Sequence, residues 1–328
     1  NVSNRPARAE APGLRDDPAS EASPAARDAF REKCGVVGVY GHPEAANLVY
    51  LGLCALQHRG QEAAGIVSSD GHVLVSHRGL GLVADVFPED IVRRLKGHAA
   101  IGHNRYSTTG ASHLKNAQPL VVEYGQGGLA VAHNGNLVNA EDLRAQLEER
   151  GSIFQSTVDT EVIVHLIAAS HAETLEDRVV EALRQVRGAY SLVFLSPEKL
   201  IAARDPRGFR PLVLGRVKGV WVLASETCAL DLVDAVYERE IEPGELVVLS
   251  EQGLRSYRPF TPASGSACIF EYIYFARPDS TVFGRSVYGA RKALGHQLAR
   301  EAPVPADIVV PVPDSGVPAA IGYAEEAK

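Results

Sequence analysis

The chain has 328 residues, a formal net charge of −7 and a hydrophobic fraction of 45%. This length suffices for one large domain or two ordinary ones, with enough apolar residues for a sizeable core. Both charge signs are spread along the chain without a basic block, so we expect no nucleic-acid partner. No apolar run is long enough to cross a membrane and no secretory signal opens the chain, so we expect no membrane association.

The cysteines indicate a reducing compartment. There are four, at positions 34, 54, 228 and 268, and none forms a C-x-x-C pair. This is neither a disulfide framework nor a complete zinc site, so we expect a cytoplasmic location. The chain also lacks methionine and ends inside a predicted helix, so we expect it to be a fragment of a longer protein.

Residues 1–33 are rich in Ala, Pro, Arg and acidic side chains and hold almost no large apolar residue before Phe30. Such a segment cannot bury enough surface to offset the entropy lost on ordering, so we predict that it is disordered. It is either a tail without a role or a leader that must be removed.

The run from Cys34 to Tyr40 is apolar and rich in β-formers, which predicts a buried strand. Cys34 itself fits a core thiol, because free cysteine is among the most buried residue types. The alternative is a nucleophile. If residue 34 becomes the first residue, its α-amino group, with a pKa of about 7.7–8.0, can act as its base. A removable leader would then block that amine until it is cut.

The following 200 residues alternate helices with consecutive hairpins. The Asp70-Gly71 turn between two apolar runs is a strong hairpin signal, and a polar turn is expected at Ser107–Gly110. Predicted helices cover 45–56, 140–149, 160–169 and 179–186, and predicted strands cover 64–68, 73–77, 99–106, 129–133, 191–195, 200–204, 211–217, 220–224 and 245–249. This order predicts an α+β layered domain and not a parallel doubly wound one.

The composition changes after Leu254. A Pro- and Ser-rich stretch at 257–267 reads as a linker. The remainder predicts an aromatic strand at 268–275, a helix at 286–300, a strand at 307–312, a loop at 313–316 and a helix from Pro318. A strand, a Gly-containing loop and a helix start are what an open α/β sheet uses to hold phosphate.

Four residues at predicted strand or helix ends are candidates for chemistry. Arg105 could hold a substrate carboxylate, although a lone arginine more often forms a surface salt bridge. Asn134 and Gly135 could stabilise an oxyanion, although Asn-Gly is more often a plain turn, and the strand before it is expected to stop there. Asp159 could bind an ammonium group, although it is more often a helix N-cap. With Cys34, they make up a site for amide hydrolysis.

The motifs CGVVGVYGH, LQHRGQEAAGI, GHNRYSTTG, AHNGNLVN, EYIYFARPDS and VVPVPDSG are spread along the chain from Cys34 to its end. On these motifs the sequence resembles the glutamine phosphoribosylpyrophosphate (PRPP) amidotransferase family. The first half is shared with the wider class of N-terminal-nucleophile amidotransferases. The resemblance implies an αββα sandwich at 34–256, followed after the linker by the start of an α/β phosphoribosyltransferase domain at 268–328.

The resemblance implies a role for each matching residue of the glutamine site. Cys34 would be the nucleophile, freed by removal of residues 1–33. The other implied roles are the α-carboxylate clamp for Arg105, the frame of the pocket for Arg59 and Gly60, the oxyanion hole for Asn134 and Gly135, and the α-ammonium acceptor for Asp159.

The resemblance also implies a second reaction. Ammonia would pass to the second domain and displace pyrophosphate from PRPP, with Mg²⁺, to give 5-phosphoribosylamine for purine biosynthesis. The loop residues Asp314, Ser315 and Gly316 match the part that meets the pyrophosphate. Cys268 matches a ligand of the [4Fe–4S] cluster found in one branch of the family. A homo-oligomer inhibited by purine nucleotides is expected.

Three alternatives differ from this interpretation. A glucosamine-6-phosphate synthase shares the first half, but the stretch FEYIYFARPDS argues against it. A non-catalytic nucleotide-binding relative would be favoured by loss of Cys34, Arg105 or Asp159, and all three are present. In the third, Cys34 stays internal because the leader is never cut. The chain also stops before the acidic PRPP-binding motif and the remaining cluster ligands, so the second site is incomplete in this sequence.

Overall fold

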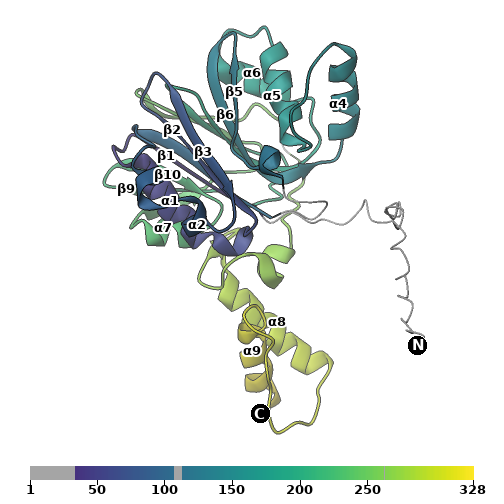
Figure 1. Cartoon of the computed structure of the whole chain (residues 1–328). Coiled ribbons are helices and arrows are strands. Elements are labelled where there is room, and N and C mark those ends of the chain that lie inside the picture. The colour runs from purple at the N-terminus through teal and green to yellow at the C-terminus, as the bar shows by residue number, and fades with distance from the viewer. Residues whose placement is uncertain (1–33, 107–112, 262) are drawn as a thin grey trace, which may run out of the picture. The chain divides into compact units, whose positions relative to one another are not determined.

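The computed structural model describes residues 34–106, 113–261 and 263–328. Two antiparallel sheets carry most of the described fold (Figure 1). The first has the strand order β11-β9-β10-β1-β4-β2-β3 and the second has the order β13-β12-β8-β7-β6-β5. The strands of the first sheet are β1 (Gly35–Tyr40), β2 (Ala63–Ser69), β3 (Leu74–Leu80), β4 (Ala99–Arg105), β9 (Val213–Val217), β10 (Val220–Ala224) and β11 (Val236–Glu240). Those of the second are β5 (Leu120–Tyr124), β6 (Gly127–Leu137), β7 (Gly188–Leu195), β8 (Leu200–Arg204), β12 (Leu246–Ser250) and β13 (Gly253–Tyr257).

Strand β1 lies at the centre of the first sheet and is buried at every position. It pairs with β10 on one side and with β4 on the other, in a register that sets Gly35 opposite Asn104. A strand covered on both faces reads as a continuous apolar run, which is why Val36, Val37 and Val39 follow one another so closely. The predicted buried strand is therefore confirmed.

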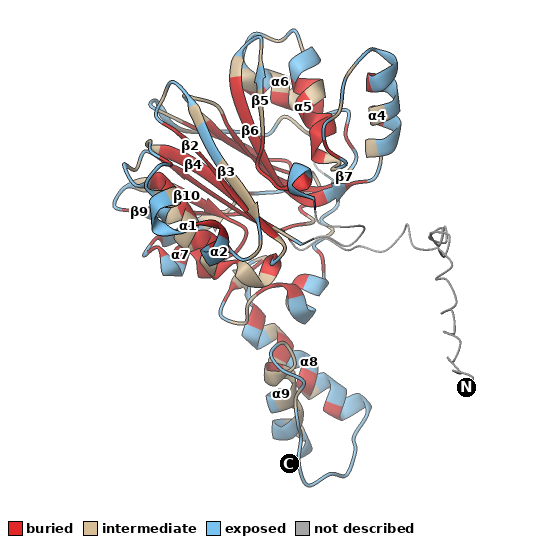
Figure 2. Ribbon diagram, viewed as in Figure 1, coloured by how far each residue is buried: buried red, intermediate tan, exposed pale blue. Residues whose placement is uncertain are grey.

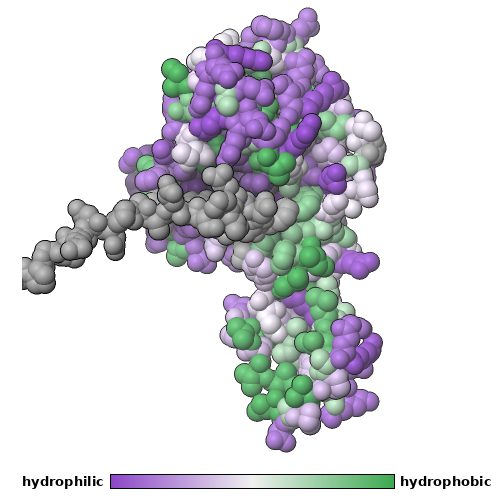
Figure 3. Space-filling model, turned by 90° about the vertical axis from the view of Figure 1, so that its right-hand side faces the viewer, coloured by the Kyte–Doolittle hydropathy of each residue, from purple (hydrophilic) through white to green (hydrophobic). Residues whose placement is uncertain are grey.

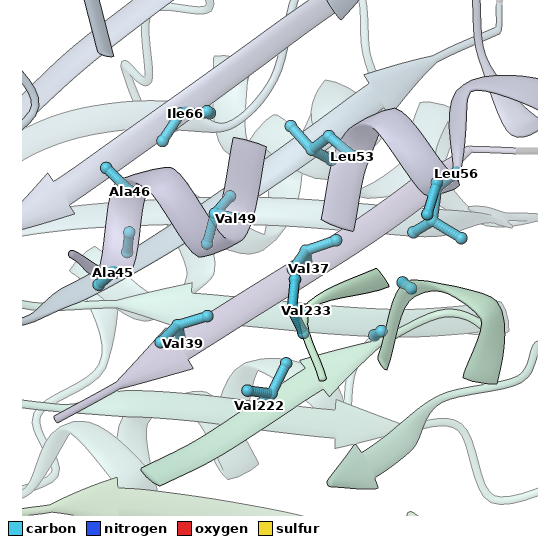
Figure 4. Packing of buried hydrophobic residues seen from close by; sticks show 14 of the residues in the cluster. Val37, Val39, Ala45, Ala46, Val49, Leu53, Leu56, Ile66, Val222 and Val233 are labelled. Carbon is cyan, nitrogen blue, oxygen red and sulfur yellow. The ribbon is translucent and has the colours of Figure 1, made fainter. Parts of the chain in front are cut away.

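Helices cover the outer face of each sheet. Over the first sheet lie α1 (Ala45–Ala55), α2 (Val83–Val86), α3 (Glu89–Val92) and α7 (Thr227–Leu232). Side chains of α1 such as Val49 and Leu53 pack with Val37 and Val39 of β1 (Figure 4). Over the second sheet lie α4 (Ala140–Glu149), α5 (Thr160–Ala169) and α6 (Leu175–Leu183).

A third apolar cluster fills the space between the two sheets, with Val36 and Ile101 from the first sheet and Val193 and Ala202 from the second. The buried positions follow the two sheets and their inner helix faces (Figure 2). Helix, sheet, sheet and helix therefore form four layers. This confirms the αββα architecture of the N-terminal-nucleophile class.

Three strands of this sandwich are not predicted from the sequence, namely β5, β11 and β13. Each is the outermost strand at an edge of its sheet. An edge strand has one free side and partly exposed faces, so its hydrophobic pattern is weak. The patterns of β11 and β13 are mostly exposed, in contrast to that of β1.

The predicted stop of a strand at Asn134-Gly135 is wrong. Strand β6 runs through both residues to Leu137, with Asn134 opposite Ser191 and Gly135 opposite Tyr190. Pairing with β7 overrides the turn preference of Asn-Gly. A Cβ atom on Gly135 would lie 2.1 Å from the Ala189 carbonyl oxygen, so the strands approach too closely for any other residue.

Two predicted strands after the linker are also wrong. The aromatic run 268–275 contains a helical turn, η4 (Glu271–Phe275), in which the rings of Tyr274 and Phe275 lie 4.5 Å apart. Residues 307–312 form no strand, and Ile308 and Val310 are about three-quarters exposed, at 74% and 75%. A strand needs a neighbour for its main-chain groups, and no described strand borders this segment.

A short hairpin and two helices make up the regular structure in the rest of this segment. The short hairpin β14 (Thr281–Val282) and β15 (Arg285–Ser286) precedes α8 (Val287–Glu301), and α9 (Val317–Ala327) packs on α8. A Cβ on Gly295 would lie 1.9 Å from the Ala319 carbonyl oxygen, so the two helices touch along their backbones. Apolar residues are numerous on the surface of this part (Figure 3). The expected α/β sheet at 268–328 stays a prediction.

The structure describes most of the predicted linker but not the predicted leader. The described residues between the end of β13 and Cys268 contain no helix or strand, and residue 262 lies outside the description. Residues 1–33 and the predicted turn at Ser107–Gly110 also lie outside the described residues. None of the helices in the described ranges has the length and apolar character required to cross a membrane.

The close contact of α1 with the first sheet gives a test of the fold. A Cβ on Gly102 of β4 would lie 2.5 Å from Val49 Cγ1 and 2.8 Å from Leu53 Cδ1. We expect Gly102→Val to lower the free energy of unfolding by about 1–3 kcal/mol, because overpacking forces the helix away from the sheet. Urea unfolding measures this. Gly125→Val, where a Cβ would meet nothing within 4 Å, is the control. Equal stability of both variants would contradict this packing.

Candidate active site

Cys34 lies directly before β1 and is buried, with 3% of its surface exposed. Its carbonyl oxygen accepts a hydrogen bond of 3.1 Å from Arg59 Nε. Two residues further on, Val36 N–H donates to Ser225 Oγ and the Val36 carbonyl accepts from Ser225 N–H, both at 3.0 Å. The main chain around the candidate nucleophile is therefore held on both sides of Gly35.

Arg105 is the last residue of β4, which pairs with β1. Because Gly35 pairs with Asn104, one further step along both antiparallel strands brings Cys34 opposite Arg105. Arg105 Nη1 is buried and has no hydrogen-bond partner among the described residues. Gly60 lies against the same strand end, since a Cβ there would be 2.6 Å from the Arg105 carbonyl carbon. The structure thus brings Cys34, Gly60 and Arg105 together.

Asn134 lies on β6, in the second sheet, and is fully buried. Neither its side-chain oxygen nor its side-chain nitrogen has a hydrogen-bond partner among the described residues. Burying an amide without partners is costly, so this amide has hydrogen-bonding capacity that a ligand can use.

A hydrogen bond between the two sheets aligns the strand ends. His103 Nε2 of β4 lies 3.0 Å from the His133 carbonyl oxygen of β6. Asn104 and Arg105 follow His103 on one strand, and Asn134 and Gly135 follow His133 on the other. The candidate carboxylate clamp and the candidate oxyanion donors therefore extend from the same cross-sheet contact.

A buried polar network supports this end of β6. His133 N–H donates to Gln118 Oε1 at 2.8 Å, and His133 Nδ1 lies 3.1 Å from Thr160 Oγ1. Gln118 Nε2 in turn donates to Thr160 Oγ1 at 3.2 Å. Sequence reasoning missed Gln118, Thr160 and the contact of His103. Their separations along the chain carry no periodic or motif signal that could have found them.

Asp159 stands at the N-cap position of α5, but its side chain does not cap the helix. Its Oδ2 instead accepts a hydrogen bond of 2.8 Å from Leu137 N–H at the end of β6, and its Oδ1 lies 3.5 Å from His133 Nδ1. Burial would raise the pKa of Asp159, but His133 and the hydrogen bond from Leu137 outweigh it and hold the pKa below its usual value. The simple N-cap interpretation is therefore wrong, and the carboxylate instead contacts β6 at His133 and Leu137, on either side of Asn134 and Gly135.

Arg59 differs from the other candidates because its charge is already paired. Its guanidinium is fully buried and donates to Glu226 Oε1 at 2.5 Å and to both oxygens of Glu271, at 2.8 and 2.9 Å. Its contact with Cys34 goes through the main chain. Glu226 and Glu271 were not identified from the sequence, because no local motif marks a carboxylate that pairs across the fold.

The predicted pyrophosphate loop lies on a separate element. Asp314 and Ser315 precede α9, and Gly316 N–H donates to the Val312 carbonyl at 3.2 Å. The Asp314 carbonyl accepts from Val317 N–H at 3.3 Å, so the loop is tied to itself and to the start of α9. The structure therefore does not bring the two groups of predicted site residues together.

Cys268 is buried, and its Sγ lies 3.6 Å from Arg210 Nη1. In the part of the chain that the structure describes, no group of three or more His, Cys, Asp or Glu side chains could hold a metal ion. The expected iron–sulfur ligand and the Mg²⁺ site stay predictions.

The four layers and the cysteine that opens a central strand are those of a class II glutamine amidotransferase. Residues 103–232 match the family described as Glutamine amidotransferase domain. The chain is 56% identical, over 90% of its length and 53% of the relative, to amidophosphoribosyltransferase 1, chloroplastic, of Arabidopsis thaliana. It is 50% identical to amidophosphoribosyltransferase of Bacillus subtilis (strain 168), over 90% of its length and 62% of that protein.

Two solved structures are similar to this chain in both sequence and fold. One, of the allosteric regulatory enzyme of purine biosynthesis, is 50% identical with a TM-score of 0.88 over 89% of this chain and 63% of that one. Another, of the glutamine PRPP amidotransferase from B. subtilis complexed with ADP and GMP, is 49% identical with a TM-score of 0.86 over 89% and 64%. Over about nine-tenths of its length the chain is therefore similar to amidophosphoribosyltransferases, at 50–56% identity. It spans about half to three-fifths of the length of the curated relatives described above.

The buried histidine of the cross-sheet contact gives a pH test. Burial, with the nearby His133 and Arg105, lowers the pKa of His103 to about 3, although its bond to the His133 carbonyl acts in the opposite sense. Above pH 6.5 His103 is neutral in both folded and unfolded chains and has no effect. As pH falls from about 6.5 towards 3, only the unfolded chain binds the proton, so stability falls by up to about 1.4 kcal/mol per pH unit.

We therefore expect His103→Gln to unfold with a shallower loss of stability between pH 6.5 and 4 than the wild type. Urea unfolding at several pH values measures the slope. His72→Gln, at an exposed position, is the control and keeps the wild-type slope. A slope for His103→Gln parallel to that of the wild type would contradict a neutral buried His103.

Proposed function

We propose that the complete protein converts PRPP to 5-phosphoribosylamine with ammonia taken from glutamine, the first step of purine biosynthesis. The observation that carries the glutaminase part is the pair of buried polar groups without partners in the described chain, Arg105 Nη1 and the Asn134 amide, beyond the His103–His133 contact. They lie at the same end of the sandwich as Cys34. The identity of 50–57% to amidophosphoribosyltransferases supports the second reaction.

In this proposal residues 1–33 are removed, so that Cys34 carries the free α-amino group. The amine takes the thiol proton, and the sulfur attacks the carboxamide carbon of glutamine. The side-chain N–H of Asn134 and the main-chain N–H of Gly135 stabilise the oxyanion that forms. The carbon–nitrogen bond then breaks, ammonia leaves with the proton, and water hydrolyses the thioester to release glutamate.

The two ends of the glutamine backbone are bound by opposite charges. Arg105 holds the α-carboxylate through its planar guanidinium, and its buried Nη1 is free for this within the described chain. Asp159 holds the α-ammonium, and its lowered pKa keeps it ionised at neutral pH. Gly60 provides the close approach to the end of β4 that a side chain would obstruct. Arg59 contributes to the frame of the pocket through the Cys34 carbonyl.

The second reaction belongs to the segment after the linker. We assign 34–256 to the amidotransferase domain, 257–267 to the linker and 268–328 to part of the phosphoribosyltransferase domain. Asp314, Ser315 and Gly316 would meet the pyrophosphate of PRPP with Mg²⁺, and Cys268 would ligate an iron–sulfur cluster together with cysteines outside this chain. Regulation by purine nucleotides is supported by the B. subtilis structure with ADP and GMP. A homo-oligomer in the cytoplasm completes the proposal, although the Arabidopsis relative is named chloroplastic.

The separation of the two reactions is testable at Cys34. We expect Cys34→Ser to abolish activity with glutamine and to leave synthesis of phosphoribosylamine from free ammonia within about twofold, because the nucleophile serves only the first reaction. Both activities are measured on the complete protein, with intact mass to confirm that the chain begins at residue 34. Equal loss of both would count against separate sites.

The unpaired amide of Asn134 allows function to be separated from stability. We expect Asn134→Leu to lower kcat for glutamine hydrolysis about 10²–10³-fold, because an oxyanion donor is lost. The melting temperature should stay or rise, since the variant removes a buried polar group that has no partner in the described chain. Asn104→Leu, which loses the 2.8 Å bond from Asn104 Nδ2 to the Leu53 carbonyl, should instead melt earlier. An Asn134→Leu variant that loses stability but keeps kcat would refute this role.

A further inference from the structure

The side chain of Arg59 joins the beginning of β1 to the segment after the linker. Its Nη2 and Nη1 donate to Glu271 Oε1 and Oε2, at 2.8 and 2.9 Å, and its Nε donates to the Cys34 carbonyl at 3.1 Å. The side chains of Arg59 and Glu271 are both fully buried. Glu271 is the first residue of η4, so a residue of 268–328 lies one side chain away from Cys34.

A second carboxylate fixes the same guanidinium from the amidotransferase side. Glu226, which precedes α7, accepts from Arg59 Nη1 at 2.5 Å. It also accepts from Ser280 Oγ at 2.7 Å and from Arg277 N–H at 2.8 Å. We call Arg59, Glu226 and Glu271 the Arg59 cluster. The segment after the linker contributes Glu271 to this cluster, and it also contacts Glu226 through Arg277 N–H and the Ser280 hydroxyl.

The shape of the guanidinium makes this contact directional. The group is planar, and a carboxylate that accepts two parallel hydrogen bonds fixes the orientation of the plane. Once Glu271 sets that plane, Nε can point in only one direction, and in this structure it points at the Cys34 carbonyl oxygen. A lysine at position 59 would keep the charge and lose this geometry.

Cys34, whose carbonyl accepts this bond, lies where the chain is less constrained by strand pairing. Pairing of β1 with β4 begins at Gly35, so Cys34 lies just beyond the paired part of the strand. Chain ends open more readily than strand interiors, and Cys34 becomes a chain end when the leader is removed. Misplacement of a reacting group by about 1 Å can cost 10²-fold in rate, so the bond to its carbonyl matters for the attack on glutamine.

We propose that Glu271 is a positioning residue for Cys34, acting through Arg59, so that the turn at the start of the second segment belongs to the glutaminase machinery. The proposal rests on the proposed glutaminase function. It adds that the rate of glutamine hydrolysis depends on a residue outside the amidotransferase domain. A purely structural ion pair would affect stability and leave the reaction of the folded protein unchanged.

The test is Glu271→Gln in the complete protein, processed to begin at Cys34. Glutamine keeps the shape but removes the charge and one of the two acceptor oxygens. We expect kcat for glutamate release to fall at least about tenfold. The KM for glutamine should change less than about twofold, because Arg105 and Asp159 are untouched. Glu271→Asp, which keeps the charge but shortens the side chain, is a second variant for the same assay.

A double-mutant cycle tests the route through Arg59. If Glu271 acts through the guanidinium, Glu271→Gln should lower kcat little further in an Arg59→Lys background. The control is Glu245→Gln, which makes the same change in a bidentate pair with Arg239, at 2.7 and 2.8 Å, where the Glu245 side chain is 2% exposed. We expect this control to melt earlier and to keep the wild-type kcat.

The outcomes separate the two proposals. Wild-type kcat in folded Glu271→Gln and Glu271→Asp, or additive losses in the cycle, would overturn the positioning role and leave the glutaminase assignment standing. A processed wild-type protein that releases no glutamate would instead overturn the proposed function itself.

Discussion

The antiparallel pairing of β1 with β4 decides where the other parts of the candidate site lie. Because Gly35 pairs with Asn104, the residue before β1 and the last residue of β4 meet at one end of the first sheet. The bond between His103 and the His133 carbonyl then brings β6 of the second sheet to the same end. The register of two strands and one cross-sheet hydrogen bond thus place Cys34, Arg105 and Asn134 together. A slip by one residue would turn each of their side chains to the other face.

Some buried polar groups at this end of the sandwich have hydrogen-bond partners in the described chain, and others have none. The main-chain atoms and the supporting side chains Gln118 and Thr160 are paired with one another, whereas the amide of Asn134 and Nη1 of Arg105 have no partner in the described chain. An unsatisfied buried polar group costs about 1–3 kcal/mol. A ligand that satisfies them recovers the cost on binding.

The sequence predicted the interior of the sandwich better than its edges and its second segment. Continuous apolar runs such as that of β1 predict central strands. The edge strands β11 and β13 are mostly exposed, so their sequences show little hydrophobic pattern. Asn134-Gly135 misled because local turn preference yields to pairing with β7. The aromatic run at 268–275 misled in the same way. Aromatic residues favour strands on average, but here Glu271 is drawn to Arg59 and the rings pack on one another in a helical turn.

The candidate site also contains residues that the sequence predicted and residues that it did not. Cys34, Arg105, Asn134, Gly135 and Asp159 could be named because each has a distinctive residue type at the predicted end of an element. The carboxylates of Glu226 and Glu271 could not be named. Their function depends on a partner more than 160 residues away in the chain, and no spacing rule connects such pairs. Long-range electrostatic contacts are set by the tertiary fold, so a single sequence contains them without displaying them.

The Arg59 cluster is also a poor choice if stability were its only purpose. Taking a guanidinium and two carboxylates out of water is expensive, and replacing a buried ion pair with apolar side chains of similar volume is often neutral or stabilising by about 1–4 kcal/mol. Burial alone would lower the pKa of Arg59, and only the two carboxylates reverse that effect and raise it. What the ionic cluster provides, and an apolar one cannot, is direction: a fixed plane whose Nε–H points at the Cys34 carbonyl. That direction is why a charged contact at the junction of the two segments is better understood as part of the site than as part of the core.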